Sequence, residues 1–260
     1  MIRLLRGLLG WLWWVALPVR RATAWANLQE ALPQGRPADL RRAVGIVAVG
    51  YLEMIVGRRP RVVGVEHLPP GGGVALMGHG GAWDLSLVEM GHHAPVTVFV
   101  KTPSSPTAAR FIRRHRERAG LELLGTEGTM ERAYAALEEG RLVIFFVDQR
   151  HNTGVPVPFF GRPAWTSPAF ASMVWRKRPP VVGLWPTVDA AGRHVLQITP
   201  VPLTVPDDRD DAIASLTTAA QAWVEAQVRR APGAWWWLHR RWRVPPGQVE
   251  PTPGGGMPGR

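Results

Sequence analysis

Short apolar segments alternate with helical ones along most of the chain, and this alternation restricts the fold more than any other feature. Apolar runs of strand length lie at residues 61–68, 74–79, 95–101, 141–149, 179–188 and 193–201. Apolar residues recur at helical spacing over residues 38–57, 82–93, 106–120, 129–140 and 210–230. Such alternation is typical of a sheet with helices packed on its faces. The sequence therefore predicts a single α/β domain with a mixed, mostly parallel central sheet flanked by helices.

The two ends of the chain differ in composition from its middle. Residues 7–19 carry no charge and lie between two pairs of arginines. They are fewer than the about 20 residues of a membrane-spanning helix, and they suit a helix in the membrane interface or a short anchor. A buried globular helix is the alternative. We predict a membrane anchor or interfacial helix, a folded catalytic-sized domain and a disordered, proline- and glycine-rich tail, over residues 1–21, 22–245 and 246–260.

Charge and composition narrow the possible partners. The net charge is +11, and the chain holds 13 tryptophans but 2 tyrosines. A basic surface attracts polyanions, and tryptophan beside arginine is typical of a bilayer interface. Nucleic acid is a poorer partner, because the basic residues are dispersed and no binding motif is present. The sequence has no cysteine, and its adjacent His92 and His93 lack the spacing of a metal hydrolase, so we predict no metal site.

A histidine directly follows the apolar run at 74–78. Two glycines come next, and Asp84 stands five residues after His79. His79 should lie at the carboxyl end of a strand, where α/β folds place their chemistry. Asp84 should lie in the first turn of the next helix and bend back to one ring nitrogen of His79. Such a pair could take a proton from a substrate hydroxyl, although this spacing also occurs by chance.

Several ordered motifs carry a family resemblance that covers about residues 20 to 245. They are HGGAWD (79–84), NLQEALP (27–33), SPTAARFIRRHRERAG (105–120), VDQRHNTGVPVPFFGRPAWTSP (147–168) and RRAPGAWWWLHRRWRVPP (229–246). With these motifs the chain resembles the lauroyl/myristoyl-type acyltransferases of bacterial lipid A biosynthesis and their relatives that acylate phosphatidylinositol mannosides. Ser105 departs from the asparagine that the family usually carries before this proline.

The resemblance implies transfer of a fatty acyl chain from a thioester to a hydroxyl of a glycolipid or lipid A-type acceptor. The co-substrate would be an acyl carrier protein thioester or acyl-CoA, with no other cofactor. The basic segment 110–118 suits an acidic carrier protein or anionic headgroups equally. Membrane lipids are the expected partners, and the cytoplasmic face of the inner membrane is the expected location. The alternatives are a catalytically silent membrane scaffold with the same fold and a phosphatidylinositol mannoside or glycerolipid acyltransferase. The sequence does not indicate an oligomeric state.

The resemblance also suggests roles for individual residues. His79 would be the general base, and Asp84 would orient it. Arg116 would bind an acceptor phosphate or polarise the thioester, unless it belongs to a solvated helix face. Asp148 could anchor Arg116 or the acceptor, or cap the turn after its strand. Gln149, Phe160 and Gly161 are also predicted to contact substrate. Phe160 and Gly161 could instead belong to an aromatic core.

Overall fold

The computed structural model describes residues 2–100, 105–125 and 128–248. Most of the predicted disordered tail, residues 249–260, lies outside them. The helices are α1 (Ile2–Val15), α2 (Arg21–Ala31), α3 (Pro37–Ile55), α4 (Trp83–Met90), α5 (Pro106–Arg118), α6 (Met130–Glu138), α7 (Ala169–Lys177) and α8 (Arg209–Arg230). The strands are β1 (Arg61–Val63), β2 (Gly73–Met77), β3 (Val96–Phe99), β4 (Glu122–Leu124), β5 (Leu142–Phe146), β6 (Val155–Phe159), β7 (Arg162–Thr166), β8 (Val181–Val188) and β9 (His194–Pro200).

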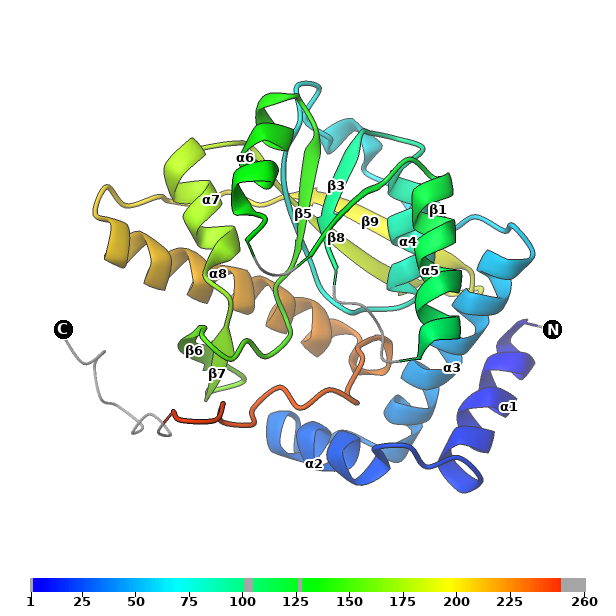
Figure 1. The fold of residues 1–260 in the computed structure, drawn as a ribbon. Coiled ribbons are helices and arrows are strands. Elements are labelled where there is room, and N and C mark those ends of the chain that lie inside the picture. The colour runs from blue at the N-terminus through cyan, green and yellow to red at the C-terminus, as the bar shows by residue number, and fades with distance from the viewer. Residues whose placement is uncertain (1, 101–104, 126–127, 249–260) are drawn as a thin grey trace.

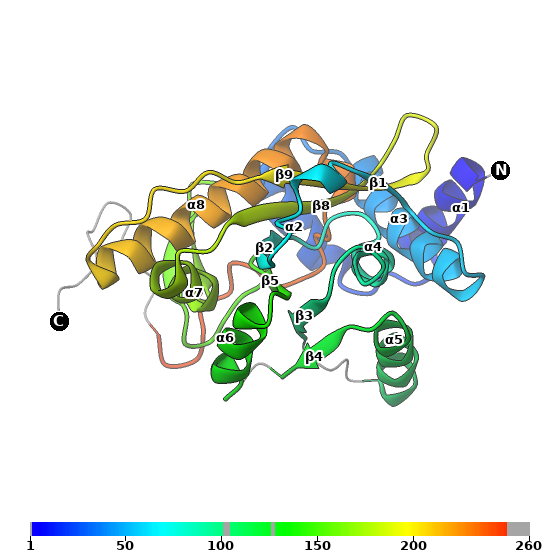
Figure 2. The same ribbon diagram turned by 90° about the horizontal axis from the view of Figure 1, so that it is seen from above.

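Seven of these strands form one sheet in the order β1-β9-β8-β2-β5-β3-β4. Every neighbouring pair is parallel except β8 and β9, which are antiparallel. Helices cover the sheet on both sides (Figures 1 and 2). The α/β fold with a mixed, mostly parallel sheet is thus confirmed, as are the strands expected at 179–188 and 193–201. The antiparallel hairpin of β6 and β7 stands apart from the sheet.

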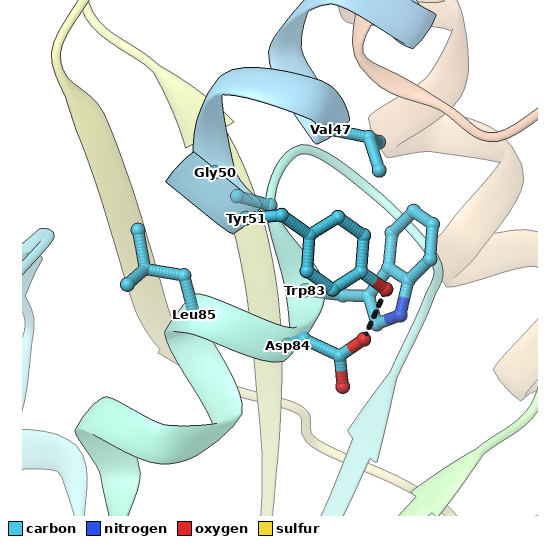
Figure 3. A pocket seen from close by; sticks show the side chains of 7 residues that line it. Val47, Gly50, Tyr51, Trp83, Asp84 and Leu85 are labelled. Carbon is cyan, nitrogen blue, oxygen red and sulfur yellow. Dashed lines mark hydrogen bonds between the residues drawn. The ribbon is translucent and has the colours of Figure 1, made fainter. Parts of the chain in front are cut away.

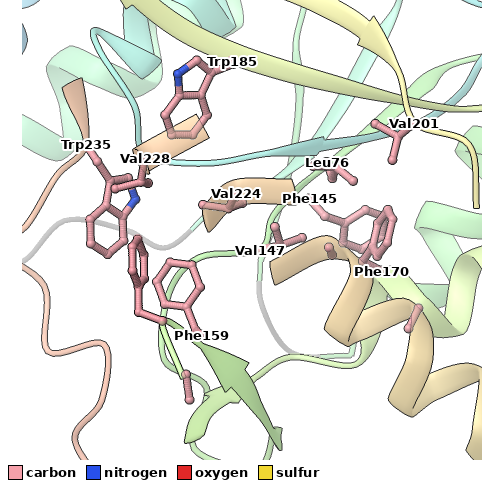
Figure 4. Close-up of a cluster of buried hydrophobic side chains, with 14 of the residues drawn as sticks. Leu76, Phe145, Val147, Phe159, Phe170, Trp185, Val201, Val224, Val228 and Trp235 are labelled. Atoms are coloured by element: carbon pink, nitrogen blue, oxygen red, sulfur yellow. The ribbon is translucent and has the colours of Figure 1, made fainter. Parts of the chain in front are cut away.

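The two faces of the central strands bury different residues. Leu76 and Phe145 belong to a core that includes residues of α6, α7, α8 and the C-terminal tryptophans (Figure 4). Ala75 and Ile144 point to the other face, in a core that includes residues of α4. Successive residues of a strand point to opposite faces, so a strand covered on both sides must be apolar throughout. The unbroken apolar run of β5 reflects this position.

Helix α1 is the predicted N-terminal helix, and it packs on α3 at close range. A side chain at Gly10 would overlap the carbonyl of Arg41, and one at Gly45 would overlap the carbonyl of Arg6. Figure 2 shows α1 beside α3 at the edge of the molecule. Its outward face exposes large apolar side chains: Leu4, Leu5, Leu8, Trp11, Leu12 and Val15. Among the described residues, no helix combines the length and the apolar character required to cross a membrane.

Candidate active site

His79 and Asp148 come together because their strands are neighbours. β2 and β5 pair in parallel and end at the same edge of the sheet, with His79 two residues beyond β2 and Asp148 two residues beyond β5. His79 Nδ1 lies 2.7 Å from Asp148 Oδ1, and the backbone N–H of His79 donates to Oδ2 at 2.6 Å. Asp148 is fully buried. The structure therefore forms a histidine–carboxylate pair from two parallel strands.

The expected pairing of Asp84 with His79 is wrong. Asp84 accepts a hydrogen bond from the Tyr51 hydroxyl at 2.6 Å (Figure 3). Its other carboxylate oxygen accepts from the Arg116 guanidinium. Asp84 does begin α4 as predicted, but α3 and α5 supply its partners. Asp148 meanwhile occupies Nδ1 of His79 and does not anchor Arg116. The four residues form two pairs in which the aspartates have exchanged their predicted partners.

The C-terminal segment 232–242 holds the His79 loop in place. Trp236 donates its backbone N–H to the carbonyl of His79 at 3.0 Å, and Gly81 donates to the carbonyl of Ala234 at 2.6 Å. The buried indole of Trp235 donates to Asp148 Oδ2 at 2.8 Å. Trp235 is not among the site residues that the sequence predicts. Its signal was the long tryptophan-rich motif of the C-terminal segment, whose partner in space the motif alone does not reveal.

These donors keep Asp148 ionised. Burial alone would raise the pKa of the Asp148 carboxyl, but the charge and hydrogen bond of His79 outweigh it, with smaller contributions from His239 and Trp235. The pKa of Asp148 consequently lies well below its ordinary value. When the His79 ring is neutral, the ionised carboxylate accepts the Nδ1 proton and the lone pair of the ring lies on Nε2. The pair is therefore suited to remove a proton from a hydroxyl group.

Gln149 is the predicted residue that the structure places against the reactive nitrogen. Its side-chain amide nitrogen lies 3.0 Å from His79 Nε2. Phe160 and Gly161 instead form the turn between β6 and β7, and both have positive φ angles. Phe160 packs against Trp237 and Trp242 of the C-terminal segment, and among the described residues neither it nor Gly161 is hydrogen-bonded to His79. Figure 4 shows Phe159 beside Trp235, so the hairpin of β6 and β7 packs against the tryptophan that bonds to Asp148.

The structure has a small cavity beside Asp84 and a larger hollow among the N-terminal helices. The cavity bounded by Tyr51, Trp83 and Asp84 has a volume of about 10 Å³, room for about one water molecule (Figure 3). A larger hollow of about 420 Å³ lies where α1, α2 and the start of α3 meet. Its lining is aromatic and basic: Trp14, Arg21, Ala22, Trp25 and Pro37. The first is too small for an acyl chain, whereas the second has the volume of a small-molecule site.

Replacing Trp235 with phenylalanine should weaken the histidine–carboxylate pair. The ring remains, but Asp148 loses the indole donor, and a hydrogen bond to a charged group contributes about 1.5–3 kcal/mol. For the acyl transfer that the family resemblance implies, we expect a rate about tenfold lower, measured by thiol release at saturating substrate. Trp236→Phe is the matched control, because the backbone of Trp236, not its indole, contacts His79. Equal rates in the two variants would contradict a role for the Trp235 indole.

Two buried histidines should make stability depend on pH. Burial, together with the charge of Arg6, lowers the pKa of His194 to about 3, and burial lowers that of His239 to about 3 as well. In the unfolded chain each histidine has a pKa of about 6.5, so below that pH the unfolded state binds protons that the folded state excludes. The folded state has its full stability above about pH 6.5, and its free energy of unfolding decreases as the pH is lowered below that value. Each histidine should remove about 2 kcal/mol between about pH 6.5 and pH 5.

Urea unfolding of the wild type and of His194→Gln at about pH 7 and pH 5 measures this effect. The variant should lose about half of the pH-dependent decrease that the histidines cause. If the unfolding free energies of both proteins fall equally between the two pH values, His194 is not the source of the dependence.

The fold and the site define an α/β protein with a histidine–carboxylate pair at one edge of its sheet. Residues 53–244 match the family of the bacterial lipid A biosynthesis acyltransferases. The match spans well over half of the chain, which belongs to this family and is an acyltransferase that acts on lipid.

Among solved structures the similarity is weaker, and curated sequences provide no match. The crystal structure of the 1-acyl-sn-glycerophosphate (LPA) acyltransferase PlsC from Thermotoga maritima is similar at 16% identity and a TM-score of 0.41. The alignment covers 87% of this chain and 96% of that one.

Proposed function

We propose that the protein transfers a fatty acyl chain from a thioester to a hydroxyl of a glycolipid or lipid A-type acceptor, with His79 as general base and Asp148 as its partner. The observation that carries this proposal is the 2.7 Å contact between His79 Nδ1 and the buried carboxylate of Asp148, which leaves Nε2 for the substrate. A base oriented by a carboxylate can activate an alcohol without a nucleophilic serine.

In the proposed reaction, the acceptor hydroxyl gives its proton to His79 Nε2. Its oxygen forms a bond to the carbonyl carbon of the thioester, and the carbon–sulfur bond then breaks. The departing thiolate takes the proton back from His79, and the acyl ester remains on the acceptor. Asp148 stabilises the imidazolium between these two steps, as the buried carboxylate does in a catalytic triad.

Arg116 has a positioning role in this proposal. Its guanidinium is engaged by Asp84, and only about a tenth of its side chain is exposed. The pair joins α4 to α5 and so fixes the basic helix beside the site. The arginines on the outer face of that helix remain exposed: Arg110, Arg113, Arg114 and Arg118. They suit an acidic surface, and we favour an acyl carrier protein thioester as the donor.

The proposed acceptor is a membrane lipid, so the enzyme has to meet a bilayer. The apolar outward face of α1 is followed by Arg20 and Arg21 at the start of α2, and the larger hollow, lined by Trp14 and Arg21, lies beside these elements. Apolar side chains flanked by arginines are suited to the headgroup region of an anionic membrane. The proposed location is the cytoplasmic face of the inner membrane.

Replacing Trp11 with glutamate should weaken membrane binding, because the exposed face of α1 then carries a charge into the interface. We expect the fraction of protein that sediments with anionic phospholipid vesicles to fall by about tenfold or more. Val63→Glu is the control, since Val63 is similarly exposed but lies on β1. If both variants bind vesicles as the wild type does, α1 is not the membrane-binding element.

Mass spectrometry of lipids tests the proposed reaction. Purified protein is incubated with a membrane lipid extract and either an acyl carrier protein thioester or acyl-CoA. A lipid that gains the mass of one acyl chain identifies the acceptor, and the faster donor identifies the co-substrate. If vesicles bind the protein but no lipid changes mass with either donor, the scaffold alternative is favoured.

A further inference from the structure

Gln149 lies at the one atom of the His79 ring that the proposed reaction requires. Asp148 engages Nδ1, and the Gln149 amide nitrogen lies 3.0 Å from Nε2. With the Nδ1 proton donated to Asp148, Nε2 can only accept a hydrogen bond, and the amide of Gln149 is a donor. The Gln149 N–H thus occupies the place that the acceptor O–H has to take.

The other sides of the His79 ring are covered by aromatic groups. The ring of Phe146 lies 4.5 Å from it between centroids, and that of Trp83 lies 5.2 Å away. Only 11% of the His79 side chain is exposed. Gln149, by contrast, is an exposed residue. Its neutral side chain can leave Nε2 at the cost of one hydrogen bond, which water or substrate can replace.

We propose that Gln149 caps the resting base and keeps water from Nε2 until the acceptor hydroxyl displaces it. This inference rests on the proposed acyl transfer. A water molecule at Nε2 would give its proton to His79, and its oxygen would bond to the thioester carbonyl carbon. Cleavage of the carbon–sulfur bond would then release a fatty acid and a free thiol. The cap suppresses this hydrolysis when acyl donor is bound without acceptor.

Thiol release from an acyl thioester in the absence of any acceptor lipid tests the cap. Gln149→Ala should hydrolyse the thioester at least about fivefold faster than the wild type, the factor expected from the loss of one ordinary hydrogen bond. Adding His79→Ala to this variant should abolish the gain, because the same base serves water. Gln197→Ala, at an exposed glutamine of β9, should behave as the wild type.

Transfer to lipid is measured in parallel and separates the two claims. If the wild type transfers acyl groups to lipid but Gln149→Ala hydrolyses the thioester no faster than the wild type, the cap is overturned. A slower transfer to lipid by Gln149→Ala would not change this conclusion. If the wild type transfers no acyl group, the proposed function fails. In that case, faster thioester hydrolysis by Gln149→Ala that requires His79 still supports the cap over Nε2. Unchanged hydrolysis by Gln149→Ala overturns it.

Discussion

Asp148→Asn should reduce the rate of acyl transfer by about 10³- to 10⁴-fold, the largest effect that we expect from a single conservative substitution. An asparagine amide can donate to Nδ1 of His79, which would place the ring proton on Nε2 and remove the base. It would also fail to stabilise the imidazolium. The variant keeps the shape of the buried side chain, so the fold should persist. Initial rates at saturating acyl thioester and acceptor measure the effect.

Asp84→Asn is the control for this result. Asp84 is the carboxylate that the sequence spacing assigns to His79, whereas in the structure it bonds to Tyr51 and Arg116. We expect a fall in rate of about tenfold at most. A large loss with Asp84→Asn and a small one with Asp148→Asn would restore the local pairing and contradict the assignment of Asp148.

Asp84→Ala should have the largest effect on stability. The Arg116 and Asp84 side chains are only 11% and 6% exposed, so removal of the carboxylate leaves a largely buried cation without its partner. Breaking such a pair costs about 3–5 kcal/mol. The Tyr51 hydroxyl loses its acceptor as well. Urea unfolding followed by circular dichroism measures the difference in unfolding free energy.

The double variant Asp84→Ala/Arg116→Met separates the unpaired charge from the loss of packing. It should recover more than half of the stability lost by Asp84→Ala, because methionine fills the space of the arginine stem without a charge. A destabilisation below about 1 kcal/mol for Asp84→Ala would mean that solvent reaches the pair and that it contributes as little as a surface salt bridge.

The fold was predictable because local patterns determine its elements. The run of β5 is apolar without interruption because the strand is buried on both faces, and the helical period of α3 follows its buried stripe. The hairpin of β6 and β7 was not predicted. Prolines at 156, 158 and 163 argue against strands, but a two-stranded hairpin outside the sheet can accommodate them.

The candidate site was predictable only in part. His79 could be found from its place after an apolar run, since strand ends in such folds carry the chemistry. Its partner could not, because the pairing of β2 with β5 spans β3 and β4 in the sequence. Sequence spacing offers only the nearest carboxylate, Asp84. Trp235 was hidden for the same reason, since it reaches Asp148 from the far end of the chain.

The central claim is that His79 is the base of an acyl transfer to lipid. Lipid mass spectrometry on wild type and His79→Ala, incubated side by side with acyl thioester and a membrane lipid extract, tests it most directly. We predict that the wild type adds one acyl mass to an acceptor lipid and that His79→Ala adds none above background, while both proteins remain folded and bind vesicles. Equal transfer by the two proteins would contradict the claim.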